Sequence, residues 1–148
     1  LIKPRNTYMY ISVNPEYFDL IQYNPEQYVS TSKFEQIQGM TITAVVYKEV
    51  NESLLIHLNT HVLEMIHHQD CCETVYLADV VGSFEDLIGY PLLEVSESIV
   101  DIATADMSST TSYYNFKTVK ASVQLRWVGE SNGYYSETVD CYLYKTGV

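Results

Sequence analysis

The chain has 148 residues, 47% of them hydrophobic, which predicts a single folded domain with one core and excludes general disorder. Nineteen acidic residues against eight basic ones give a net charge of −11. A field of that sign repels nucleic-acid phosphates, so we expect no DNA or RNA partner. No apolar run approaches the roughly 20 residues that span a bilayer, so we expect no membrane partner either.

The first 38 residues differ from the rest of the chain. An Asn-Pro-Glu element followed by tyrosine occurs twice, at residues 14–17 and 24–28. Asparagine as N-cap, proline at the first helical position and glutamate in the first turn predict a short helix over residues 15–22. The second copy predicts a turn or one further helical turn. We therefore divide the chain into a Tyr-rich appendage, residues 1–38, and a β-rich domain, residues 39–148.

From Gly39 onward the pattern is that of strands and turns. β-branched and aromatic runs predict strands at residues 40–50, 53–59, 62–68, 72–82 and 92–99. The first two flank Asn51-Glu52, which predicts a hairpin. Ser83 as N-cap, acidic residues in the first turn and Gly89 at the end predict one short helix. The polar residues 101–111 predict a loop.

The last third of the chain has the clearest strand patterns, in residues 112–129 and 134–145. Alternation predicts that one face carries the apolar residues Val119, Ala121, Val123, Leu125 and Trp127.

We expect these two segments to form a hairpin. Residues opposite each other point to the same face, and a three-residue loop, 131–133, with its glycine left-handed, satisfies this by pairing Leu125 with Val139. In that register Glu137 lies opposite Trp127 on the core side. A carboxylate there needs a partner or an opening to water.

The segment "HHQDCC", residues 67–72, concentrates possible metal ligands. Zinc accepts every one of these side-chain types. Adjacent His-His and Cys-Cys pairs point to opposite sides of a strand, however, so at most one of each could reach the same ion. The four-residue spacing of His57 and His61 would place both side chains on one face of a helix. These two residues lie on an apparent strand and turn, however, where the same spacing does not direct them to one metal ion. We therefore expect no metal and no cofactor.

A cysteine nucleophile is a second interpretation of the same segment, with His67 or His68 as its base. No glycine-rich oxyanion loop or strand-to-helix elbow accompanies it. Three cysteines do not make a disulfide framework, and a bond between Cys71 and Cys72 would close a strained ring. We expect reduced thiols, as in a cytoplasm.

Two further interpretations remain open. The acidic residues could supply paired-carboxylate chemistry, and the candidates are Asp70, Glu73, Asp79 and Glu137. Alternatively, residues 67–72 form only a polar bend between two strands, with Cys72 buried as a small hydrophobe.

Three blocks of the sequence resemble a family of small bacteriophage proteins of unknown function. The first is His67 or His68 followed by Gln69, Asp70, Cys71, Cys72 and Glu73, then Val75, Tyr76 and Asp79. The second is Gly82, Asp86, Leu87, Ile88, Gly89 and Pro91. The third is Arg126, Trp127, Gly129, Ser131, Asn132, Gly133, Tyr134, Tyr135, Ser136, Glu137 and Val139.

This resemblance covers roughly residues 39–140 and leaves the Tyr-rich segment outside it. The family pattern has a single histidine where this chain has His67 and His68. The resemblance implies a viral context and a site formed by its first and last blocks, but it implies no reaction.

Together, these features predict a mainly β (α+β) fold, an antiparallel sheet or small barrel-like domain with one or two short helices. The expected function is a phage-encoded, non-enzymatic binding domain that recognises a small polar ligand or a host or viral protein surface. The expected ligand-binding residues are His68, Asp70, Cys71, Glu73, Arg126, Asn132, Tyr135 and Glu137. Tyrosine rings would stack on the ligand, Arg126 and Glu137 would recognise charge, and Asn132 would hydrogen-bond.

Two other functions remain open. The chain could be a virion structural protein that docks through its N-terminal arm, or a Cys- or metal-dependent enzyme. We expect the host cytoplasm as its location, or the virion under the structural alternative. Exposed strand edges and 14 tyrosines favour a homo-oligomer.

Overall fold

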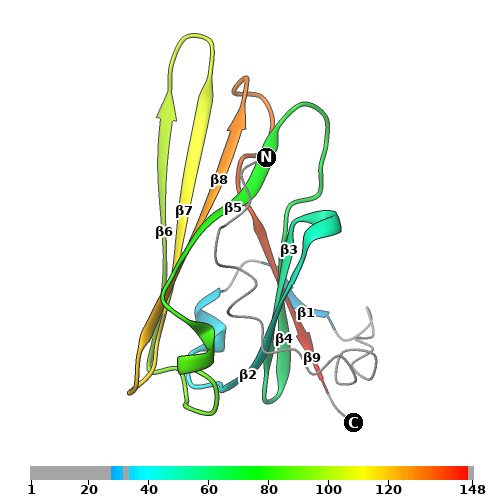
Figure 1. Cartoon of the computed structure of the whole chain (residues 1–148). Coiled ribbons are helices and arrows are strands. Elements are labelled where there is room, and N and C mark those ends of the chain that lie inside the picture. The colour runs from blue at the N-terminus through cyan, green and yellow to red at the C-terminus, as the bar shows by residue number, and fades with distance from the viewer. Residues whose placement is uncertain (1–27, 32–33, 147–148) are drawn as a thin grey trace.

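The computed structural model describes residues 28–31 and 34–146 as two antiparallel sheets packed face to face (Figure 1). The predicted mainly β fold is confirmed, and the sheets stay open rather than closing into a barrel. The helices of the described residues are three short 3-10 turns. None of the described helices is long and apolar enough to cross a bilayer. The helix predicted over residues 15–22 lies outside the described residues.

The first sheet has five strands in the order β1-β9-β4-β3-β2. Their bounds are β1 Tyr28–Thr31, β2 Ile42–Lys48, β3 Ser53–Leu58, β4 His61–Ile66 and β9 Asp140–Lys145. The predicted hairpin is confirmed, because β2 pairs with β3 through the 3-10 helix η4, Glu49–Asn51. Every residue of β3 is buried, as expected of a central strand with a continuous apolar run.

The second sheet has four strands in the order β5-β8-β7-β6. Their bounds are β5 Thr74–Val81, β6 Glu94–Ala103, β7 Ser108–Lys117 and β8 Ser122–Ser131. The loop predicted over residues 101–111 is mostly strand, and only residues 104–107 form the turn of a long β6–β7 hairpin. The polar composition was misleading because this hairpin lies at the sheet edge, where serine and threonine can face water.

The core lies between the two sheets. Trp127, Tyr114 and Phe116 are its largest side chains from the second sheet, each at most 1% exposed. Phe34 and Ile37, at the ends of the 3-10 helix η3, Phe34–Ile37, are fully buried against them. The Phe34 ring meets the rings of Tyr114 and Phe116 edge to face. The packed fold therefore includes residues that precede the expected domain start at residue 39.

The predicted C-terminal hairpin is wrong. β8 pairs with β5 and β7, whereas β9 pairs with β1 and β4, so the two strands lie in opposite sheets. Leu125 lies opposite Val80 and Tyr114 instead of Val139. The apolar faces of β8 and β9 still both point into the core, because the two sheets pack with their apolar faces toward each other. Gly133 is left-handed, with φ of +95°, as predicted.

Two local predictions also need correction. Residues 84–86 form the 3-10 helix η5, Phe84–Asp86, but Ser83 makes no side-chain cap hydrogen bond. Val119 is not on the apolar face of a strand: it is 75% exposed in the turn between β7 and β8. Thr118 initiates this turn, since its hydroxyl accepts hydrogen bonds from the backbone of Lys120 and Ala121.

Candidate functional site

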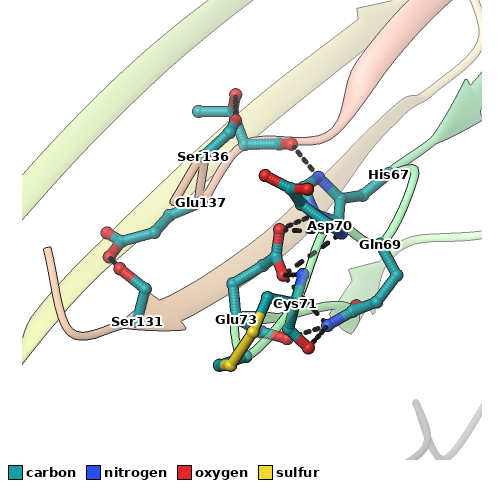
Figure 2. Close-up of polar contacts among 10 residues, drawn as sticks. His67, Gln69, Asp70, Cys71, Glu73, Ser131, Ser136 and Glu137 are labelled. Carbon is teal, nitrogen blue, oxygen red and sulfur yellow. Dashed lines mark hydrogen bonds and ion pairs between the residues drawn. A yellow bond between two sulfur atoms is a disulfide. The ribbon is translucent and has the colours of Figure 1, made fainter. Parts of the chain in front are cut away.

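The loop of residues 67–73 connects β4 of one sheet to β5 of the other and is built around the carboxylate of Glu73 (Figure 2). That carboxylate is buried. It accepts hydrogen bonds from His67 Nε2 at 3.0 Å, from Gln69 Nε2 at 3.0 Å and from the backbone N–H of Cys71 at 2.9 Å. The N–H of Asp70 adds a longer one at 3.2 Å. The loop thus folds around the carboxylate of its own last residue, Glu73.

The charge on Glu73 is stabilised inside the fold. Burial alone would raise the pKa of this carboxyl group. Hydrogen bonds from the backbone of Cys71 and of Glu73 itself, from His67 and from the backbone of Asp70 outweigh it and lower the pKa to about 2. Glu73 is therefore ionised at neutral pH.

His67 ties this loop to the C-terminal part of the chain. Its Nδ1 lies 3.0 Å from the carbonyl oxygen of Thr138, and its Nε2 lies 3.0 Å from Glu73. Both ring nitrogens of His67 are therefore engaged within the fold, one by the C-terminal segment and one by the loop. His68, by contrast, is exposed and meets the Tyr142 ring edge to face at 5.8 Å between centroids. The histidine that faces inward is therefore His67, whereas His68 faces the surface.

The expectation of reduced thiols at residues 71 and 72 is wrong, because Cys71 and Cys72 form a disulfide (Figure 2). The two residues lie in a bend rather than in a strand, so their side chains do not alternate and the sulfurs can meet. The third cysteine, Cys141, is buried, and burial and the charge of Glu97 raise its pKa to about 12. None of the three is poised as a thiolate nucleophile.

Cysteine labelling provides a direct check. With iodoacetamide we expect no modification of the folded protein, one modification in urea without reductant, at Cys141, and three in urea after reduction. The reason is that only an accessible thiolate reacts. Intact-mass spectrometry counts the added groups, and the variant Cys141→Ser should show none in urea without reductant. Two modifications of the folded protein would mean that Cys71 and Cys72 are reduced.

Glu137, the second candidate carboxylate, is 8% exposed. The requirement for a partner is confirmed, although its neighbours differ from those predicted. Its carboxylate accepts hydrogen bonds from the hydroxyls of Ser108 at 3.0 Å, Thr110 at 2.8 Å and Ser131. These three hydroxyls hold the segment 132–139 over the end of the four-stranded sheet.

The first and last blocks of the sequence resemblance therefore lie side by side, joined by the hydrogen bond between His67 and Thr138. Asn132 and Tyr135 belong to the segment 132–139, where Asn132 accepts a bond from the Tyr134 backbone and the Tyr135 ring packs on the Tyr134 ring. Arg126 is not brought to this cluster. It lies on the outer face of the second sheet, between Asp79 of β5 and Tyr113 of β7.

A cleft of about 430 Å³ opens beside the loop. Its walls are the end of β4, the start of β5 and the β2–β3 turn, and it is lined by Asn51, Glu52, Ile66, His67, His68, Gln69, Glu73, Thr74 and Val75. Asn51 and Glu52 were predicted only as a turn. Their polarity is ordinary for a hairpin, so no sequence signal indicated that the turn faces the loop across a cleft.

In residues 28–31 and 34–146 no group of three or more His, Cys, Asp or Glu side chains is arranged to hold a metal ion.

Comparison with protein families identifies the two adjoining blocks as parts of one domain. The profile of a domain of unknown function, DUF7448, matches residues 31–141. The chain belongs to the DUF7448 family. The match begins at the last residue of β1 and ends in β9, so this DUF7448 domain spans both sheets, the loop 67–73 and the segment 132–139. Comparison with curated proteins and with solved structures gave no significant match.

Proposed function

We propose that this protein is a phage-encoded, non-enzymatic binding domain that recognises a small polar molecule in the cleft beside the loop 67–73. The observation that carries the proposal is the construction of the loop. Four donors converge on the buried Glu73 carboxylate, and a cleft of about 430 Å³ lies against the loop they hold. A wall fixed before binding loses little conformational entropy when a ligand arrives.

The polar groups of the cleft favour a ligand with a cationic group. The Glu73 carboxylate is already occupied by donors of its own loop, among them His67 and the backbone N–H of Cys71. Glu52, on the opposite wall, is half-buried and accepts a hydrogen bond from the Tyr47 hydroxyl, which holds its carboxylate in place. Ile66 and Val75 supply an apolar surface. An amine or guanidinium with a short apolar stem matches this combination.

The proposal is for a non-enzymatic protein because the side chains that could act as a general acid, a general base or a nucleophile are already engaged or buried. The two buried carboxylates, Glu73 and Glu137, are each occupied by three or more hydrogen-bond donors, which leaves neither placed to act as a general acid or base. The cysteines are bonded or buried. The viral origin and action in the host cytoplasm rest on the sequence resemblance, and the acidic charge supports the absence of nucleic acid among the partners.

The test is a titration of the full chain, labelled with ¹⁵N and followed by NMR, with arginine, spermidine and the neutral sugar trehalose as probes. We expect the two cationic probes to shift amide signals of residues 51–52, 66–69 and 74–75, and trehalose to shift none. The variant Glu52→Gln should bind about tenfold more weakly, since it loses one charge-assisted hydrogen bond. The control Glu85→Gln, exposed in η5, should bind as the wild type does. Equal responses to all three probes, or no response at the cleft, would refute the proposal.

A further inference from the structure

A second surface, separate from the cleft, lies along β6. This ten-residue strand forms the edge of the four-stranded sheet and pairs along its whole length with β7 alone among the described residues (Figure 1). In an antiparallel pair every second residue points its backbone N–H and C=O away from its partner. The outer edge of β6 therefore offers a row of backbone donors and acceptors to an added strand.

The only charged residues of β6 are acidic, and the strand has no other guard against an added strand. Ile99, Val100 and Ile102 are 47%, 50% and 62% exposed. Natural edge strands are usually guarded by lysine, proline or a bulge, yet β6 contains neither residue type and keeps a regular register from Glu94 to Ala103. A long, regular edge with exposed apolar residues is typical of a strand that receives a partner.

A cavity of about 290 Å³ opens at the same edge, between β6 and β9. It is lined by Glu97 and Ile99 of β6, Tyr114 of β7 and residues 138–142. β1 pairs only with Tyr142, Leu143 and Tyr144, so in the described part of the chain it leaves the start of β9 uncovered. Ile99 is half exposed although it points to the inner side of its sheet, opposite the buried Ser112, because none of the described strands of the other sheet covers it.

The charges of this edge all have one sign. β6 contributes Glu94, Glu97 and Asp101, and the start of β9 contributes Asp140 at the cavity. Neither β6 nor residues 138–142 contain lysine or arginine. Pairing of β6 with β6 of a second copy would bring these carboxylates together in two chains that each carry −11. A basic strand is the complementary occupant.

We propose that β6 binds an extended basic segment of a partner protein as an additional strand of the sheet. Side chains of that segment opposite Val100 and Ile102 are apolar. The inward-pointing side chain opposite Ile99, next to the one opposite Val100, is lysine or arginine and enters the cavity between Glu97 and Asp140. Backbone hydrogen bonds supply the affinity and the cavity supplies the selectivity, as in other strand-addition complexes.

The experiment uses the full chain and a blocked seven-residue peptide of alternating lysine and valine. Two control peptides carry glutamate in place of lysine, or N-methylated peptide bonds that remove the backbone donors. We expect the lysine peptide to shift NMR signals of residues 97–102 and 138–141, and to bind at least tenfold more tightly than either control. Its affinity should fall with added salt.

Variants of the protein test whether the peptide binds at β6. Asp140→Asn should weaken binding several-fold, whereas Glu85→Gln, an exposed acidic residue of η5 that lines neither the edge nor the cavity, should leave it unchanged. Val100→Lys, which adds a charge to the edge, should abolish binding while circular dichroism and thermal unfolding remain those of the wild type. Binding that persists in Val100→Lys, or that is equal for the N-methylated peptide, overturns the proposal. So does a wild-type dimer in sedimentation that Val100→Lys dissociates, because the occupant is then a second copy.

Discussion

The substitution Gly129→Ala is expected to lower the free energy of unfolding by more than about 3 kcal/mol or to prevent folding. A Cβ at this buried position of β8 would overlap the carbonyl oxygen of Glu137 and lie 2.5 Å from its carbonyl carbon and 2.7 Å from its Cα. These are backbone atoms, so no side-chain rotation can relieve the clash. The segment 132–139 would have to leave β8.

The displacement would also break two sets of hydrogen bonds. Glu137 would lose the hydroxyls of Ser108 and Thr110, and Thr138 would lose His67. Urea unfolding followed by tryptophan fluorescence measures the effect, because Trp127 is the only tryptophan and is buried two residues away. The control Glu130→Ala, exposed on the same strand, should change stability by less than about 0.5 kcal/mol. A Gly129→Ala protein within about 1 kcal/mol of the wild type would show that the segment does not pack on β8.

The case of Gly129 shows where sequence reasoning ends. Alternation correctly predicted that Val123, Leu125 and Trp127 face the core. It could not predict which strands pair with β8, because strands of both sheets turn an apolar face to the core and show the same alternation. The glycine that permits the chain to cross over β8 stands in an ordinary strand pattern. Its necessity appears only when a segment from elsewhere in the chain lies against it.

The candidate site shows a similar limit. The composition of residues 67–72 drew attention to this loop, and the prediction was that its side chains contact a ligand. In the structure His67 and Glu73 face inward and hold the loop, whereas Asp70 contributes its backbone N–H. Spacing on an assumed strand placed neighbouring side chains on opposite sides, and a bend removes that alternation. The cleft wall at Asn51 and Glu52 had no distinctive sequence at all.

Acid is expected to destabilise the protein through Glu73. The folded-state pKa of this carboxyl group, about 2, lies below its ordinary value of 4.5. A carboxyl group with a lowered pKa stabilises the fold fully above its unfolded value, and this contribution is lost as the pH falls through the folded value. The stabilisation should therefore be constant from neutral pH down to about 4.5, and should decline between about 4.5 and about 2.

The variant Glu73→Gln isolates this contribution. An amide retains one acceptor oxygen and turns an N–H₂ group toward the donors of His67, Asp70 and Cys71, so the variant should be less stable than the wild type at pH 7. The difference in unfolding free energy, measured in urea at a series of pH values, should shrink as the pH falls from 4.5 toward 2. Glu130→Gln, an exposed control on β8, should follow the wild type throughout. A difference between wild type and Glu73→Gln that does not change with pH would mean that the loop is held by packing and not by the charge at its centre.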